Sequence, residues 1–173
     1  MSNIYKNCPV LETEHFILRL VKESDAENLL NCYSDERTQS LFNADNCTSD
    51  FCFNTLDDIQ KCIASWILAY EQESFVRFAI INKSNDEAIG TIEMFGSSGR
   101  GILRIDICFN HENIISLTEL INLCINNFYD LFNVNDILTK AIPQAKERIK
   151  SLLKTGFKLY DLKGREHYFI RSK

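Results

Sequence analysis

Two acidic side chains, Glu93 and Asp106, interrupt segments that otherwise consist of apolar, strand-forming residues. A carboxylate buried in a strand needs a polar partner, and one that reaches a cleft can act as a general base. Such a base serves reactions in which a proton must leave an attacking nucleophile. We therefore take both acids as candidate catalytic residues. The structural alternative is that each acid only pairs with a neighbouring donor.

The expected strand register gives the two acids different surroundings. If the hairpins close symmetrically, Glu93 lies between Arg77 and Arg104, which would keep it charged. Glu93 would then be a weak base, and it would belong to an ion network or clamp an anionic substrate. The same register places Asp106 opposite Thr91 with no cation beside it. Asp106 is therefore the better candidate base, acting directly or through a water.

Cysteine and histidine suggest a second chemistry at the end of the same strand. Cys108 and His111 are three residues apart, a spacing that a nucleophilic dyad can have. No nucleophile turn or fixed third group accompanies them, so Cys108 is expected to be a small buried apolar residue. Cys47 and Cys52 lack a second ligand pair, and the histidines are far apart in the sequence. The sequence therefore predicts no metal site.

The segments that position these residues lie where the hydrophobic period changes from about 3.6 to 2. We expect three consecutive strands there, at Phe75–Asn82, Ala88–Phe95 and Ile102–Phe109. The short polar or glycine-rich connections between them are typical of hairpins and predict an antiparallel meander. Symmetric closure would pair Asn82 with Ala88 and Phe95 with Ile102.

Further strands and helices flank this meander. We expect strands at Phe16–Val21, Ile137–Ile142, Phe157–Tyr160 and Tyr168–Arg171. Helices are expected after a capping box of Ser24 and Glu27, after Thr55, from Ser116 to Phe132, and between Pro143 and Gly156. This order predicts a single α/β domain over residues 1–173. Its sheet would be mixed and mostly antiparallel, with six to seven strands and helices on both faces.

The composition excludes several classes of protein. The 173 residues are 45% hydrophobic and 25% charged and contain no linker-like segment, which is typical of one globular domain. The longest apolar stretch, Ile63–Tyr70, is too short to span a membrane, and no signal peptide is recognisable. Seven cysteines without a pairing pattern favour the reducing cytoplasm. The net charge of −5 argues against a nucleic-acid partner.

Several segments resemble the GNAT superfamily, in the branch similar to ribosomal-protein N-terminal acetyltransferases. The opening run Leu11–Leu20, followed by Glu23–Ala26, resembles the start of that branch. Thr118-Glu119 and the closing segment Leu152–Phe157 are also similar to it. The resemblance extends from residue 9 to the C-terminus in the order, spacing and type of the expected elements.

The resemblance implies direct transfer of an acetyl group from acetyl-CoA to a primary amine, in a fold whose fourth and fifth strands diverge. Those strands would be Ile102–Phe109 and Ile137–Ile142. The pantetheine arm would lie between them and meet backbone groups of Ile107, Cys108 and Phe109. The pyrophosphate would lie at the helix N-terminus at Ser116, where free N–H groups and the helix dipole favour an anion.

The loop before that helix departs from the family, which usually has glycines there so that the backbone approaches the diphosphate closely. The corresponding residues 110–115 include no glycine. Glu112 adds negative charge near the phosphates, and a capping box between Ser116 and Glu119 would use the N–H groups of the helix itself. The candidate cofactor-binding residues here are Asn113, which tolerates a left-handed backbone, Ile114, the bulky Ile115, and Ser116.

The helix after Pro143 also departs from the family. Ala145 and Arg148 stand where the family favours Asn and Ser, and Leu152 stands where some relatives have a Tyr that protonates the leaving thiolate. Arg148, with Lys146 and Lys150, can donate charge-assisted hydrogen bonds to phosphates and replace part of the missing loop contacts. The alternative is that these basic residues are solvated on a surface helix.

Two functions remain open from the sequence. The first is an acetyl-CoA-dependent N-acetyltransferase that acts on a small-molecule or peptide amine, with the acidic net charge slightly favouring a cationic acceptor. The second is a catalytically degenerate protein that keeps the GNAT fold and serves as a ligand-binding or interaction module.

Overall fold

The computed structural model describes residues 4–43 and 51–173. In this part of the chain one eight-stranded sheet has the order β1-β2-β3-β4-β5-β6-β8-β7. The strands are β1 (Leu11–Glu12), β2 (Phe16–Leu20), β3 (Val76–Asn82), β4 (Glu87–Ser97), β5 (Arg100–Ile107), β6 (Asp136–Lys140), β7 (Lys158–Leu162) and β8 (Arg165–Ser172). The helices are α1 (Ala26–Tyr33), α2 (Glu36–Gln39), α3 (Leu56–Glu71), α4 (Ile114–Leu131) and α5 (Lys146–Lys154).

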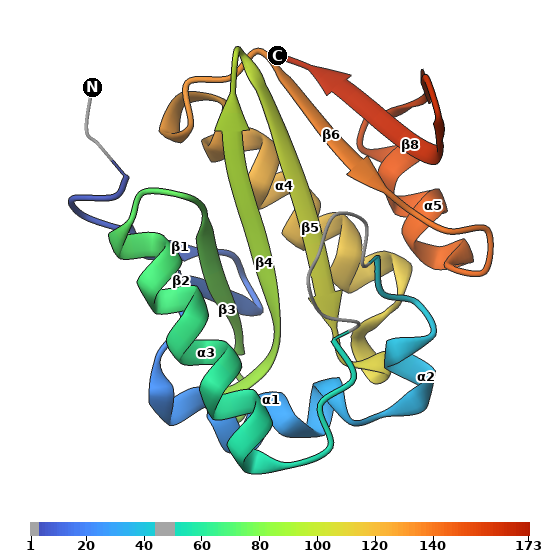
Figure 1. The fold of residues 1–173 in the computed structure, drawn as a ribbon. Coiled ribbons are helices and arrows are strands. Elements are labelled where there is room, and N and C mark those ends of the chain that lie inside the picture. The colour runs from blue at the N-terminus through green and yellow to red at the C-terminus, as the bar shows by residue number, and fades with distance from the viewer. Residues whose placement is uncertain (1–3, 44–50) are drawn as a thin grey trace.

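The architecture confirms the expected α/β fold with a mixed, mostly antiparallel sheet. Only β5 and β6 run parallel, and the other neighbouring pairs are antiparallel. Helices α4 and α5 pack on one face of the sheet, and α1 and α3 on the other (Figure 1). The sheet has one strand more than the six to seven expected, because the two-residue β1 is too short to show an alternating pattern.

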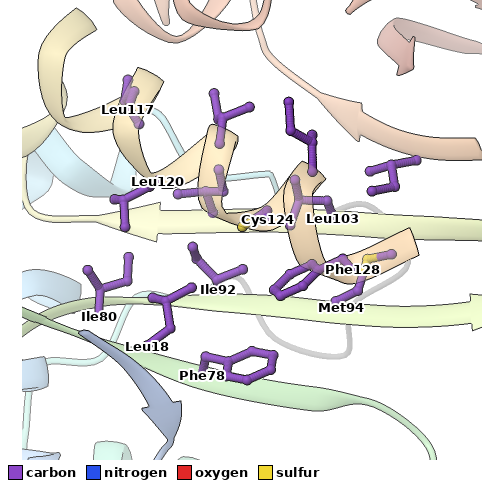
Figure 2. Packing of buried hydrophobic residues seen from close by; sticks show 14 of the residues in the cluster. Leu18, Phe78, Ile80, Ile92, Met94, Leu103, Leu117, Leu120, Cys124 and Phe128 are labelled. Carbon is purple, nitrogen blue, oxygen red and sulfur yellow. The ribbon is translucent and has the colours of Figure 1, made fainter. Parts of the chain in front are cut away.

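The larger core lies between α4 and the sheet. Buried residues recur along one side of α4, as the amphipathic pattern predicted, and include Leu117, Leu120, Cys124 and Phe128. Figure 2 shows these side chains facing residues of the strands, namely Leu18, Phe78, Ile80, Ile92, Met94 and Leu103. The rings of Phe78 and Phe128 stack with their centroids 5.4 Å apart. This packing fixes α4 against the strands that border the site.

The two hairpins of the meander close almost as predicted. Phe95 pairs with Ile102, which confirms the second hairpin. In the first hairpin, Asn82 pairs with Glu87, so the expected pairing with Ala88 is wrong by one residue. The error does not extend along the strands, because the register shifts by one residue between Ile81 and Ile80. From Ile80 to Val76 the pairing is the one predicted.

A β-bulge in β4 produces that shift. Ile89 is the extra residue, since its neighbours in β4 pair with consecutive residues of β3. At the adjacent Gly90, a Cβ atom would lie 2.2 Å from the carbonyl oxygen of Asp106. Only glycine therefore lets β5 approach β4 this closely. The bulge brings the rest of the meander into the predicted register.

The start signals of two helices have different outcomes. Thr55 caps α3 as predicted, because its Oγ1 accepts a hydrogen bond from the Asp58 amide at 3.2 Å. The expected capping box of Ser24 and Glu27 is wrong, since Asp25 accepts the hydrogen bond of the Lys22 amide at 2.8 Å instead. In the described residues, no helix combines the length and the apolar character that crossing a membrane requires.

Strands β5 and β6 diverge, as the family resemblance implied. They pair only where Arg100–Ile102 faces Asp136–Leu138. Beyond that point β5 continues to Ile107 and β6 to Lys140 without pairing with each other. In Figure 1, β6 runs away from the lower part of β5. The divergence leaves one edge of β5 without a neighbouring strand, and we call this region the β5–β6 opening.

Candidate functional site

A buried ionic network crosses three strands on the face that carries α1 and α3. Arg77 of β3, Glu93 of β4 and Arg104 of β5 are direct register neighbours, as predicted. Glu93 forms an ion pair with Arg77 through Oε2, and its Oε1 accepts a hydrogen bond from Arg104 Nη1 at 3.0 Å. The three side chains are at most 8% exposed. The structure therefore confirms that Glu93 lies between two arginines.

The expectation that no cation stands beside Asp106 is wrong. Arg77 Nη1 donates a hydrogen bond to Asp106 Oδ2 at 3.0 Å. Asp106 faces Thr91 as predicted, but the long Arg77 side chain extends diagonally along the sheet and reaches the next register pair. Arg77 also donates to Thr91 Oγ1 at 3.1 Å. One guanidinium therefore serves both acids.

Asp106 lies beneath Tyr33, a residue that the sequence did not identify as part of the site. The Tyr33 hydroxyl donates to Asp106 Oδ2 at 2.9 Å, and Asp106 is fully buried. Burial raises the pKa of Asp106, while the positive charges of Arg77 and Arg104 act in the opposite direction. Burial and the nearby Asp106 also hold the pKa of Tyr33 well above its usual value. Asp106 Oδ1 accepts no hydrogen bond from any described residue.

A cavity of about 1100 Å³ opens above this network. Its lining includes Arg77, Glu93 and Arg104, but not Asp106. Aromatic side chains form much of its wall, namely Phe51, Phe53, Trp66, Phe75, Phe95 and Tyr168. The guanidinium carbon of Arg77 lies 4.3 Å from the Trp66 ring centroid, a cation–π distance. Of the two candidate acids, only Glu93 reaches the cavity.

The backbone at the end of β5 offers fewer free groups than the sequence implied. The amide of Cys108 donates to Ile89 O at 2.8 Å, and the amide of Phe109 donates to Thr38 Oγ1 at 3.1 Å. The carbonyl of Ile105 faces away from β4, because it accepts a hydrogen bond from Arg148. Peptide groups alternate along a strand, so those of Ile107 face the same way. Of residues 107–109, Ile107 is therefore the one whose backbone faces the opening.

Helix α4 begins at Ile114, two residues earlier than expected, because Asn113 caps it. Asn113 Oδ1 accepts from the amides of Ile115 at 3.1 Å and Ser116 at 3.0 Å. The expected capping box of Ser116 and Glu119 is wrong, since Glu119 accepts hydrogen bonds from the amide and the ring of His15. Ile115 is 74% exposed, so its side chain does not fill the opening.

Arg148 and Glu112 pair with each other, although we expected Arg148 to attract the phosphates of the cofactor and Glu112 to repel them. Arg148 Nε and Nη2 donate to the Glu112 carboxylate at 2.9 and 2.6 Å. Arg148 Nη1 donates to Ile105 O at 2.7 Å. Both side chains are only 5% exposed. The alternative of a solvated surface residue is therefore wrong for Arg148.

The family assignment follows from residues 15–158, which match the family described as Acetyltransferase (GNAT) domain. The chain belongs to the GNAT acetyltransferases. It is 22% identical over 152 residues to the uncharacterized N-acetyltransferase YoaA of Bacillus subtilis (strain 168), a match that covers 86% of this chain and 82% of YoaA. This membership confirms the expected acetyl-CoA-dependent N-acetyltransferase, whose acceptor is an amine.

Solved structures of GNAT proteins share the fold. The ribosomal-protein-S5-alanine acetyltransferase of Vibrio fischeri superposes with a TM-score of 0.72 at 18% identity, over 95% of this chain and 96% of that one. RimL, the ribosomal L7/L12 alpha-N-protein acetyltransferase in complex with coenzyme A, gives 0.75 at 10% identity, over 95% of this chain and 98% of RimL.

The residues of this GNAT enzyme are suited to contact two parts of acetyl-CoA, the pantetheine arm and the diphosphate. The inward-facing peptide groups of Ile107 can bond the amides of the pantetheine arm, as an added strand would. The N-terminus of α4 and Arg148 would face the phosphates, in place of Asn113 Oδ1 and the Glu112 carboxylate that they bond here. When bound, the cofactor supplies the thioester from which the acetyl group is transferred.

The structure gives Cys108 and His111, the candidate nucleophilic dyad, different side-chain neighbours. Cys108 is only partly buried, so the expectation of a fully buried residue is wrong. Its thiol neighbours that of Cys32, a contact that lowers the pKa of Cys108. The ring of His111 instead packs edge-on against Phe16, with centroids 6.1 Å apart. In the described residues no three metal-ligating side chains come together, and Cys47 lies outside those residues.

Proposed function

We propose that this GNAT enzyme acetylates the N-terminal α-amine of a protein or peptide, which enters through the cavity above the ionic network. The position of Glu93 carries the proposal, because of the two candidate acids it is the one that lines the cavity, whereas the other acid of the lining, Asp58, belongs to the N-terminal cap of α3. The cavity is also lined by Ile102 of β5 and Tyr168 of β8. These strands lie on either side of β6, so the cavity borders the β5–β6 opening. An amine beside Glu93 would then lie close to the thioester.

The size and wall of the cavity favour a peptide chain as the acceptor. Its volume of about 1100 Å³ lies just above the range of small-molecule pockets, which span about 300–1,000 Å³. This leaves room for several groups beside the amine, and aromatic side chains such as Trp66 and Phe75 can pack against them. Two similar structures bear the names of ribosomal-protein acetyltransferases, which supports a protein acceptor.

Glu93 and Asp106 take different roles in this proposal. Glu93 would accept the proton that the amine loses, directly or through a water. Its ion pairs with Arg77 and Arg104 make it a weaker base than a free carboxylate, but they hold it at the cavity wall, which Asp106 does not reach. Asp106 does not line the cavity, so we assign it the positioning of Arg77 and Tyr33. This assignment reverses the order of the two candidates that the sequence favoured.

We also propose that the glycine-free loop 110–115 binds the diphosphate less through its backbone than the family usually does. The amides of Ile115 and Ser116 already bond the side chain of Asn113. A ligand that uses these amides must displace Asn113 Oδ1. Side-chain donors, above all Arg148, therefore become more important for cofactor binding in this chain.

The test is acetylation of a peptide with one α-amine and one internal lysine, followed by mass spectrometry of the fragments. We expect the acetyl group on the α-amine alone. A matched peptide with a blocked N-terminus should remain unmodified. Acetylation of the lysine in both peptides, or of spermidine but of neither peptide, would contradict the proposed acceptor.

Glu93→Gln tests the assigned base. We expect kcat/KM to fall about 100-fold, because loss of a general base typically costs 10²–10⁴-fold. Asp106→Asn should cost less, since Asn keeps an acceptor for Tyr33 and Arg77. A larger loss in Asp106→Asn than in Glu93→Gln would return the role of base to Asp106.

A further inference from the structure

The Glu112–Arg148 pair connects two elements across the β5–β6 opening. Arg148 projects from α5, and Glu112 directly precedes Asn113, the N-cap of α4. The two residues are 36 positions apart in the sequence, and two parallel hydrogen bonds of 2.9 and 2.6 Å join them. With each side chain only 5% exposed, the pair is shielded from solvent on both sides.

The same arginine occupies a backbone group that faces the opening. Its Nη1 donates to Ile105 O at 2.7 Å. Ile105 lies three residues beyond Ile102, the last residue of β5 that pairs with β6. A pantetheine arm placed along this edge of β5 would therefore meet the Arg148 guanidinium. In the arrangement that the structure shows, the arm and Arg148 compete for the same edge.

We infer that the Glu112–Arg148 pair closes the β5–β6 opening in the free enzyme, and that the CoA diphosphate opens it by replacing Glu112 as the partner of Arg148. The inference rests on the proposed placement of the cofactor. A guanidinium bonds a phosphate with the same parallel geometry as a carboxylate. Arg148 therefore remains paired throughout the exchange, whereas Glu112 moves toward solvent.

The exchange makes Glu112 a competitor of the cofactor. Breaking a buried ion pair without a replacement is costly because it leaves an unpaired charge, so closure is stable as long as no anion is present. A diphosphate with its two negative charges, next to the N-terminus of α4, can compensate for the loss. A ligand without phosphates therefore cannot displace Glu112 from Arg148, and the opening stays closed to it.

Calorimetric titration with CoA alone tests the inference. Glu112→Gln removes the competing charge, and we expect it to bind CoA about tenfold more tightly than the wild type, which corresponds to about 1.4 kcal/mol. Glu147→Gln is the matched control, since it removes the same charge from the residue before Arg148, where Glu147 pairs with the exposed Lys150. The control should stay within about twofold of the wild type, because it leaves the closing pair intact. Equal or weaker CoA binding by Glu112→Gln would overturn the inference.

A double-mutant cycle separates partner exchange from general repulsion between Glu112 and the phosphates. Arg148→Gln should bind CoA about tenfold more weakly, because a charge-assisted contact is lost. Adding Glu112→Gln in that background should have no further effect, since no partner is left to exchange. An undiminished tenfold gain in the Arg148→Gln background would overturn the exchange.

Thermal unfolding without ligand shows that each variant is folded, and Glu112→Asp replaces Glu112→Gln if needed. Its shorter side chain cannot keep both hydrogen bonds to Arg148, so it should also bind CoA more tightly than the wild type. These titrations contain no acceptor. A wrong acceptor assignment would therefore leave their results unchanged, and failure of the closing pair would leave the peptide assay unchanged.

Discussion

The enzyme buries arginine–carboxylate contacts in two regions with different connectivity. Above the sheet, Arg77 serves both Glu93 and Asp106, and Glu93 also bonds Arg104. At the β5–β6 opening, Arg148 pairs with one carboxylate among the described residues, that of Glu112. The first region comes from three neighbouring strands, whereas the second joins a loop to a helix.

The two regions are suited to different tasks, because one holds the Glu93 side chain in place and the other allows one anion to replace another beside Arg148. In the network Arg77 and Glu93 each take part in two ion pairs, so removing either one breaks both of its pairs. The network is therefore suited to holding Glu93 in one geometry. In the Glu112–Arg148 pair one anion can replace another and leave the arginine paired. Buried charges thus provide rigidity where they are shared and a ligand-dependent contact where they form a single pair.

The largest effect should come from breaking the shared arginine. Arg77→Met leaves Glu93 and Asp106 each with a lost bond, and we expect the free energy of unfolding to fall by about 3–5 kcal/mol in urea titration. Arg19→Met is the control, because Arg19 pairs with the single acid Asp25 and is 22% exposed. If both substitutions cost the same, sharing does not explain the stability of the network.

The bulge that sets the register of the network gives the next largest effect. Gly90→Ala places a Cβ 2.2 Å from the Asp106 carbonyl oxygen, and we expect a loss of about 2–4 kcal/mol in unfolding free energy. In Gly101→Ala the new atom first meets the flexible end of Met94, so the loss should be smaller. A larger loss in Gly101→Ala would show that this close approach of β4 and β5 is not rigid.

The pH dependence of Asp106 reports on burial within the network. Burial raises the pKa of Asp106 in the folded protein above its usual value of 3.8. The stability that this raised pKa provides is therefore fully present below pH 3.8, and it is lost as the pH rises through the pKa of the folded protein. The wild type should therefore lose stability relative to Asp106→Asn as the pH increases from about 4. Urea titrations of both proteins across pH 4–8 measure the difference. A difference that is constant or grows with pH would contradict the raised pKa.

His111, next to Glu112, should show the smallest effect and the opposite sign. Burial lowers its pKa below 6.5, so the unfolded chain takes up a proton more readily than the folded one. The wild type should lose stability relative to His111→Gln as the pH falls below 6.5. The same urea titrations detect this trend, and a difference independent of pH would contradict it.

Much of the ionic network could be predicted from the sequence. Alternating apolar residues and short turns placed Glu93 between Arg77 and Arg104 because register depends on local pattern. The reach of Arg77 to Asp106 could not be predicted, since side-chain length and direction are not part of the pattern. Tyr33 carried no signal beyond its place on an apolar helix face, and its contact with Asp106 depends on how α1 packs.

The sequence by itself determined most of the elements, most of the register and the family, because these follow from periodicity and motifs that are local in the chain. Strand β1 and helix α2 are too short to leave such a pattern. Only the tertiary structure decided which charges meet. Glu112 and Arg148 are distant in sequence. From the sequence we expected Glu112 to repel the phosphates and Arg148 to attract them, each independently of the other. Their contact exists because α5 packs against α4 beside diverging strands, and such packing has no periodic trace in the sequence.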